Sequence, residues 1–206
     1  MRADAATGSA MSRLSELELE HLDPTQRALF DAITGGKRSA REGGGATVTP
    51  AGGLRGPFNA LLHAPHVGDP AQRLGERLRF DGVLSARQRE VGVLCVAARW
   101  RAEYEWWAHA RIARECGVSG EAIEAIRRRT RPPLDNPGEM LVHDFARSLL
   151  DEQLVSDSLY ADTVAALGEA AVVELVVLLG YYCLISMLLV GFQVPVPDGE
   201  TPPFGD

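Results

Sequence analysis

The strongest constraint on this chain is a run of twenty residues, 175–194, that contains no charged side chain. The run is long enough to cross a membrane as a helix. However, Tyr181, Tyr182 and Ser186 interrupt it, and no cluster of Lys or Arg lies near either end to set an orientation. A helix that is apolar on every side is more simply explained by burial inside protein. In a chain of 206 residues we expect part of that burial to lie in a subunit interface, and therefore a soluble homo-oligomer rather than a membrane anchor.

The composition is that of one globular domain and excludes several classes of function. Hydrophobic residues make up 46% of the chain and charged residues 24%, and the net charge of −7 argues against nucleic-acid binding. Lys37 is the only lysine, so no other residue can act as a Schiff-base lysine. Cys95, Cys116 and Cys183 are odd in number and form no CxxC motif, which argues against a disulfide framework, a thiolate zinc site and a thioredoxin-like redox pair. The polar start of the sequence lacks a signal-peptide pattern, so we expect a cytoplasmic protein.

Signals for helix starts and ends predict an all-α fold. Asp23 before a proline is typical of a helix N-terminus, and so is Ser85 with Gln88 three residues later. Gly117 is typical of a C-terminus, and no run of alternating apolar and polar residues predicts a strand. Eight glycines within residues 35–56 predict a long mobile loop. The expected helices cover residues 24–33, 57–63, 70–80, 86–98, 103–116, 120–128, 137–151, 157–167 and 169–191.

Glu105 and His109 form the first candidate for acid–base chemistry. They are four residues apart on one expected helix, which places both side chains on the same face. A carboxylate near an imidazole raises its pKa and fixes its orientation, which suits general acid–base catalysis. An exposed helix pair of no functional importance explains the spacing equally well. Glu90 lies within an apolar helix, and on spacing alone a solvated position beside Arg87 and Arg89 is the simpler interpretation.

A second candidate follows the glycine-rich loop. Asn59 and His63 are also four residues apart, and Asn59 can donate a hydrogen bond to a ligand carbonyl or carboxylate. Arg55 can supply positive charge to the same ligand. A structural role for Asn59 at the start of a helix is the somewhat stronger alternative.

A third candidate is the pair Glu139 and His143, followed by Asp144. Together with Glu105 and His109 this pair suggests a carboxylate–histidine metal site. The spacing differs from the Glu-x-x-His motif of di-iron bundles, and the sequence contains no HExxH. We therefore favour surface positions for Glu139 and Asp144, at the edge of the buried stripe of an amphipathic helix. That stripe consists of Met140, Leu141, Phe145 and Leu149.

Several segments together resemble one known family. They are GPFNALLH at 56–63, RxRE at 87–90, EYEWxxH at 103–109 and ECGVSxEAIEAI at 115–126, with a closing apolar helix within 172–197. In this combination the chain resembles the carboxymuconolactone decarboxylase family, also called the AhpD-like family. The resemblance implies an all-α, AhpD-like helical bundle that forms homo-oligomers, either trimers or hexamers.

The expected domain organisation follows from the extent of this resemblance. We expect one AhpD-like domain at residues 23–197, preceded by a flexible N-terminal segment at 1–22 and followed by a C-terminal tail at 198–206.

The same resemblance separates two branches of chemistry. The peroxidase branch matches this chain at Glu90 and His109, but it places a CxxC pair where this chain has Ala102 and Glu105. Because both thiols are missing, disulfide-based peroxide reduction is not carried over. The chain looks like the decarboxylase-type branch, whose members are expected to act without a cofactor on small carboxylated lactones or keto acids.

The resulting hypothesis assigns roles around one imidazole. His109, oriented by Glu105, would donate and accept the proton. Glu90 would not contact the substrate but would hold His109 or a water in position. Neither a metal nor a cofactor is expected, and the glycine-rich loop would close over the ligand. An isomerase or cyclase of a secondary metabolite and a non-catalytic binder of small ligands remain the alternatives. The expected substrate-binding residues are Arg55, Phe58, Asn59, His63, Tyr104 and Trp106.

Overall fold

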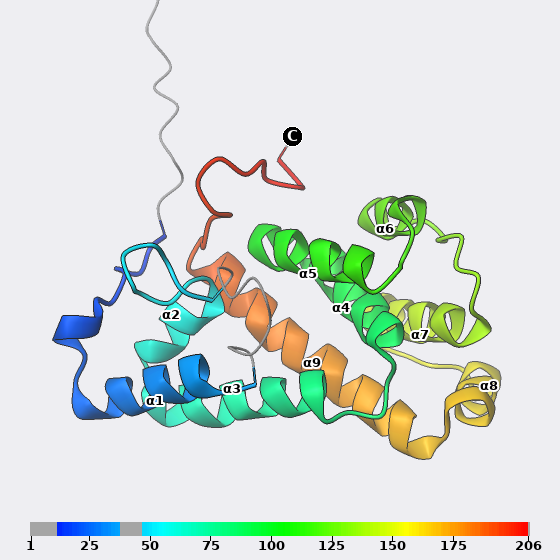
Figure 1. The fold of residues 1–206 in the computed structure, drawn as a ribbon. Coiled ribbons are helices and arrows are strands. Elements are labelled where there is room, and N and C mark those ends of the chain that lie inside the picture. The colour runs from blue at the N-terminus through cyan, green and yellow to red at the C-terminus, as the bar shows by residue number, and fades with distance from the viewer. Residues whose placement is uncertain (1–11, 38–46, 206) are drawn as a thin grey trace, which may run out of the picture.

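The computed structural model describes residues 12–37 and 47–205, and within these ranges the expected all-α fold is confirmed (Figure 1). The described residues contain no strand, only an isolated bridge between Val48 and Leu54. The helices are α1 (Pro24–Gly35), α2 (Pro57–Leu62), α3 (Pro65–Phe80), α4 (Ala86–Trp100), α5 (Glu103–Glu115), α6 (Gly120–Arg127), α7 (Pro137–Arg147), α8 (Asp157–Leu167) and α9 (Glu169–Gly191), with short 3-10 and π-helical turns at Leu19–His21 and Ser148–Glu152.

Side-chain caps fix the helix starts where the sequence predicted them. The Asp23 carboxylate accepts hydrogen bonds from the backbone N–H groups of Thr25 and Gln26, and Gln26 reaches back to the Asp23 N–H. Ser85 and Gln88 form the same reciprocal capping box at α4. These bonds satisfy donors that a helix N-terminus otherwise leaves unpaired.

Two helices differ from the expected bounds. The third begins at Pro65 rather than Pro70, so that Pro70 lies inside it. A proline at this depth removes one backbone hydrogen bond, which the helix tolerates near its N-terminus. The expected helix at 137–151 is an α-helix only to Arg147 and continues as a π-helical turn that ends at Gln153 in the left-handed region.

α9 is the central element of the fold. In Figure 1 it runs diagonally through the molecule, with α1–α3 on one side and α4 and α5 on the other, and it packs against α2, α3, α4, α5 and α8. Leu175, Leu178 and Leu179 on its inner face are almost completely buried. Among the described residues α9 is the one helix long and apolar enough to span a membrane, but 50% of its most apolar window is buried inside the fold.

Both chain ends contact the helical domain. The backbone N–H of Arg13 donates to the carbonyl of Phe192, and its guanidinium donates to the carbonyl of Gly191 at the C-terminus of α9. In the C-terminal tail, the Phe204 ring packs edge-on against Trp106, with 5.4 Å between ring centroids. The segments expected to be a flexible N-terminus and a tail therefore make specific contacts, at least from residue 12 onwards and at Phe204.

The predicted loop at 35–56 is only partly described, because residues 38–46 lie outside the described ranges. Residues 47–55 form a turn in which Thr49 accepts the Gly52 N–H and donates its own N–H to Gly53. Leu54 is 1% exposed and belongs to the apolar cluster of α1–α3. This half of the loop is therefore packed into the fold rather than loosely attached.

Glu174 joins α9 to the turn between α3 and α4. Its carboxylate accepts the backbone N–H groups of Val83 at 2.7 Å and Leu84 at 3.1 Å. A Cβ at Gly82 would lie 2.2 Å from the same carboxylate, so the close approach depends on a glycine. Hydrogen bonds to a charged acceptor are stronger than neutral ones, and this contact fixes where α4 begins relative to α9.

We expect Glu174→Ala to lower the free energy of unfolding by roughly 1–3 kcal/mol, because it leaves two backbone donors without their charged acceptor. Chemical denaturation measured by circular dichroism tests this, with Glu152→Ala at an exposed glutamate as the control. A loss no larger than that of the control would contradict the assigned role.

Candidate functional site

The site is built where α4 and α5 pack together. Nδ1 of His109 on α5 lies 2.6 Å from Oε2 of Glu90 on α4, and Nε2 lies 3.2 Å from Oε1 of Glu105 one helical turn earlier. All three residues are nearly inaccessible, with Glu90 1%, Glu105 3% and His109 6% exposed. The structure thus brings Glu90, Glu105 and His109 together, as the sequence hypothesis required.

The geometry favours the protonated form of His109. A neutral imidazole carries one N–H and would turn a bare nitrogen towards one of the carboxylates, whereas an imidazolium presents an N–H to each. Burial by itself lowers the pKa of His109, but the negative charges of Glu90 and Glu105 outweigh it and raise this pKa to about 9. His109 is therefore cationic at neutral pH.

The same pairing keeps Glu90 ionised. Burial by itself raises the pKa of the Glu90 carboxyl, but the adjacent His109, with smaller contributions from Arg79 and Arg89, holds it below its ordinary value. Nε of Arg89 lies 3.5 Å from Oε1 of Glu90. Two carboxylates are thus buried together, which is tolerable only because cationic groups surround them.

Tyr182 on α9 is a site residue that sequence reasoning missed. Its ring packs edge-on against the His109 ring, with 5.0 Å between centroids and an interplanar angle of 82°. Burial, together with the charges of Glu90 and Glu105, raises the pKa of its phenol well above the ordinary value, so Tyr182 stays neutral. The available signal was a pair of tyrosines, Tyr181 and Tyr182, inside an otherwise aliphatic run.

Tyr104 and Arg55 lie together beside the first turn of α5. Gly56 has a φ of +59°, and a Cβ there would lie 2.3 Å from the Tyr104 ring, so only glycine permits this packing. Burial and the charge of Glu105 raise the pKa of the Tyr104 phenol, and the positive charge of Arg55 opposes this rise. Nε of Arg55 is buried and has no hydrogen-bond partner among the described residues. Because a buried unpaired donor is rare, this group is the best candidate for holding a ligand oxygen.

The structure gives other partners to Asn59 and His63. The Asn59 amide accepts the Leu17 N–H through Oδ1 and donates to the Ser15 carbonyl through Nδ2. Nε2 of His63 lies 3.0 Å from the same Ser15 carbonyl. These two side chains attach the N-terminal segment to α2, which matches the structural alternative for Asn59 and leaves neither amide group of Asn59 free for a ligand.

The two apolar side chains expected to line the site are also used in packing. Phe58 packs against the cluster of α1–α3. Trp106 is 4% exposed, and its ring is in contact with Phe204 of the C-terminal tail. Of the six expected substrate-binding residues, Arg55 therefore remains the one best placed to meet a ligand.

The expectation of surface positions on α7 is wrong for Glu139. This residue is 2% exposed, and Arg87 on α4 binds it with two contacts, at 2.7 Å (Nε–Oε1) and 2.9 Å (Nη2–Oε2). A bidentate guanidinium neutralises the carboxylate and allows its burial. His143 is also buried, and its Nδ1 lies 2.9 Å from Oδ1 of Asp144. No group of three or more His, Cys, Asp or Glu side chains in the described ranges is arranged to hold a metal ion.

Comparison with known proteins finds one family that matches part of the chain. Residues 65–147 match the sequence model of the carboxymuconolactone decarboxylase family, a region that includes Glu90, Glu105 and His109. Over these residues the chain is similar to the carboxymuconolactone decarboxylase family. Among proteins with curated functions, none matches this chain.

Two solved structures share the fold of this chain. One is an uncharacterised peroxidase-related protein from Ralstonia eutropha JMP134, described as an alkylhydroperoxidase AhpD core; it is 16% identical, with a TM-score of 0.71 over 91% of this chain and 93% of that one. The other is an uncharacterised peroxidase-related protein from Silicibacter sp. TM1040, 12% identical, with a TM-score of 0.71 over 94% of this chain and 96% of that one.

Cys95 lies apart from the His109 site. Cys95 is buried, and burial raises the pKa of its thiol to about 12, so the reactive thiolate is scarce at neutral pH. The charged residues that act on Cys95 are Asp144, Arg147 and Asp151, which belong to α7 and the turn after it rather than to the His109 site. The side chain next to Nε2 of His109 is the carboxylate of Glu105, not a thiol.

We expect His109 to titrate with a midpoint near pH 9, and Glu90→Gln to lower that midpoint, because burial then acts with less opposition from negative charge. NMR of protein labelled with ¹³C-histidine measures the midpoint, and Glu121→Gln, far along the chain on exposed α6, serves as the control. A wild-type midpoint at or below 6.5 would show that the imidazolium assignment is incorrect.

The raised pKa also sets a stability profile. Because the pKa of His109 is higher in the folded state than the ordinary 6.5, its stabilisation is complete below pH 6.5 and is lost as the pH rises through about 9. The loss in the free energy of unfolding should approach about 3 kcal/mol. Chemical denaturation at several pH values between 6 and 10 measures this loss. A free energy of unfolding that stays constant over that range would contradict the prediction.

Proposed function

We propose that this protein is a cofactor-independent decarboxylase of a small carboxylated lactone or keto acid, and that it acts in the cytoplasm. The observation that carries the proposal is a buried imidazolium between two carboxylates, with a glutamate in place of the thiol beside it. These three side chains can hold a proton and transfer it, which is the function that acid–base catalysis requires of a site.

Decarboxylation has two demands that these residues can meet. The bond between the carboxylate carbon and its neighbour breaks, CO2 leaves, and the electron pair moves into a conjugated carbonyl to give an enolate. The site must stabilise the enolate oxygen and then protonate the carbon. The Arg55 guanidinium, whose Nε has no partner within the described ranges, is suited to the oxygen. The neutral rings of Tyr104 and Tyr182 provide surroundings of low polarity, which favour expulsion of neutral CO2.

Glu105 rather than His109 is the group that meets the substrate in this proposal. Both ring nitrogens of His109 already face a carboxylate, whereas Glu105 uses one oxygen towards Nε2. The proton therefore passes from the imidazolium to Glu105 and from Glu105 to the enolate carbon. Glu90 holds the imidazole in place during the transfer, and water returns the proton to the trio after product leaves. The sequence had suggested His109 as the proton donor and Glu105 as the residue that orients it. In this arrangement Glu105 is the donor to the substrate and His109 supplies its proton.

We expect Glu105→Gln to reduce turnover by about 100-fold or more, the usual contribution of general acid–base catalysis. The assay measures CO2 released from a panel of carboxylated lactones and 3-keto acids, including carboxymuconolactone itself, with Glu121→Gln as a surface control. A residual rate within about tenfold of wild type would refute the role of Glu105. Proton exchange without CO2 release would instead identify an isomerase, and binding without either reaction a non-catalytic ligand binder.

The proposal also predicts that the protein lacks thiol peroxidase activity. Glu105 lies beside His109, and the buried Cys95 thiol stays protonated at neutral pH and is not activated by the His109 site. Reduction of cumene hydroperoxide with dithiothreitol as electron donor should equal the enzyme-free blank. A rate that exceeds the blank and disappears when the three cysteines are replaced by serine would place the protein in the peroxidase branch.

A further inference from the structure

Three arginines from three different elements converge on one aspartate. Oδ1 of Asp151, in the π-helical turn after α7, lies 2.5 Å from Nη2 of Arg129 and 3.3 Å from Nε of Arg99. Oδ2 of the same carboxylate accepts the Nε–H of Arg147 at 2.5 Å. Arg99 belongs to α4, Arg129 follows α6, and Arg147 is the last residue of α7. Because α4 packs against both α6 and α7, the fold brings these side chains to one point (Figure 1).

This arginine cluster, which consists of Arg99, Arg129 and Arg147 around Asp151, has an excess of positive charge. A guanidinium stays ionised at every physiological pH, and the single carboxylate supplies only one negative charge. The cluster therefore carries an excess of two positive charges, in a protein whose net charge is −7. Asp144, the nearest carboxylate on α7, does not offset this excess, because Arg131 binds it at 3.2 Å.

The guanidiniums are held in place and still have unused donors. Arg147 also donates its Nη1–H to the backbone carbonyl of Arg129 at 2.8 Å. Each guanidinium has five N–H groups, and the contacts with described residues occupy only one or two of them in each arginine. The side chains of Arg99, Arg129 and Arg147 are 49%, 41% and 31% exposed, against 20% for Asp151. The carboxylate is thus the inner part of the cluster, and a ligand can reach the guanidiniums from solvent.

Arg129 occupies a backbone position that ordinarily selects for glycine. Its φ is +58°, in the left-handed region. Its N–H donates to the carbonyl of Ile126, and the N–H of Thr130 donates to the carbonyl of Ala125, which is the hydrogen-bond pattern of a helix C-terminus closed by glycine. A side chain at such a position is unfavourable, and a partly exposed ion pair adds little stability in return. The pairing with Asp151 alone therefore does not explain why an arginine stands here.

We propose that the arginine cluster binds the phosphate group of a small soluble molecule. A phosphate monoester carries about 1.5 to 2 negative charges at neutral pH and presents three acceptor oxygens, which matches the excess charge and the three guanidiniums. A carboxylate would balance only one of the two excess charges. Asp151 holds the arginines side by side before the ligand arrives, so fewer side chains have to be ordered on binding. The cluster is a single point rather than a track of cations, which favours a small ligand over a nucleic acid.

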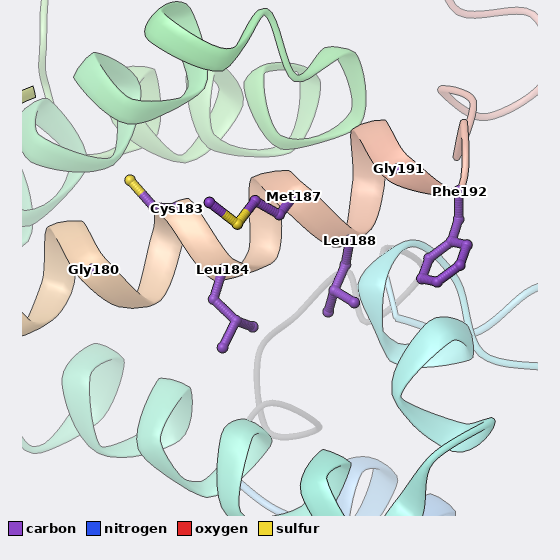
Figure 2. Close-up of a pocket in the computed structure, with 7 residues that line it drawn as sticks. All are labelled: Gly180, Cys183, Leu184, Met187, Leu188, Gly191 and Phe192. Carbon is purple, nitrogen blue, oxygen red and sulfur yellow. The ribbon is translucent and has the colours of Figure 1, made fainter. Parts of the chain in front are cut away.

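The phosphate site is separate from the other features of the surface and from the His109 site. A groove on the outer side of α9 is lined only by residues of that helix and by Phe192, and none of these side chains carries a charge that would hold an anion (Figure 2). Arg99 follows Glu90 on α4 by more than two helical turns. The inference therefore does not depend on the proposed reaction, and each can fail without the other.

Calorimetric titration with inorganic phosphate at constant ionic strength tests the site directly. The wild type should bind phosphate saturably with one site per chain. Arg129→Gln should weaken this binding by about tenfold or more, the usual contribution of a hydrogen bond to a charged group. Arg27→Gln, which removes a guanidinium paired with a single aspartate on α1, should bind like the wild type. No saturable binding by the wild type, or equal binding by Arg129→Gln, would overturn the proposal.

Further probes distinguish the source of the phosphate group. A panel of sugar and nucleoside monophosphates should contain compounds that bind at least as tightly as inorganic phosphate. Binding of inorganic phosphate without any of these monoesters would show an adventitious ion only and refute the proposal. Sedimentation with vesicles of phosphatidic acid and phosphatidylcholine should leave the protein in solution. Vesicle binding that Arg129→Gln abolishes would assign the site to a lipid and refute a soluble ligand.

Asp151→Asn keeps the proposal testable even if Arg129→Gln fails to fold. This variant keeps the three guanidiniums but removes the negative charge between them, so its midpoint of thermal unfolding in chloride should fall below that of the wild type. Phosphate at the same ionic strength should restore the midpoint saturably, because a ligand that binds the folded state stabilises it. Asp31→Asn, which removes the partner of Arg27, is the matched control and should show no such rescue. Equal effects of phosphate on the two variants would contradict a phosphate site.

Discussion

The burial of two carboxylates next to one imidazole is the interaction on which the site depends. Glu90 and Glu105 are removed from water at the junction of α4 and α5, where an isolated negative charge would be very unfavourable. The imidazolium of His109 compensates both, and it can do so only while the two helices stay packed in one register. The acid–base chemistry therefore depends on the packing of α4 against α5. A change that separates the two helices also removes the chemistry.

Local sequence signals predicted the elements well, because their causes are local. Capping boxes at Asp23 and Ser85 act within three residues, and the pair Glu105 and His109 needs only the helical repeat. Glu90 is different, since it lies 19 residues from His109 and reaches it only through the packing of two helices. On spacing alone it looked like a solvated residue between arginines, and the resemblance to a known family supplied what the spacing could not.

The expectations that failed share one physical origin, which is that a polar side chain can find its partner elsewhere in the fold. Asn59 looked free to bind a ligand, but the N-terminal segment uses both ends of its amide. Glu139 looked exposed, but Arg87, 52 residues away, pairs with it and permits burial. Tyr182 looked like an interruption of an apolar run, although its position in α9 brings it against His109. Each partner comes from a distant part of the chain, so periodicity within one helix could not reveal it.

The position of α9 in the chain has a consequence for how the protein is made. Among the described helices α9 comes last in the order of the chain, yet α2, α3, α4, α5 and α8 all pack against it. Until residues 169–191 have emerged from the ribosome, the buried faces of α4 and α5 lack their central wall and remain in contact with water. The domain therefore completes its fold only after α9 has been synthesised, and chains that stop before α9 expose the apolar surfaces from which aggregation begins.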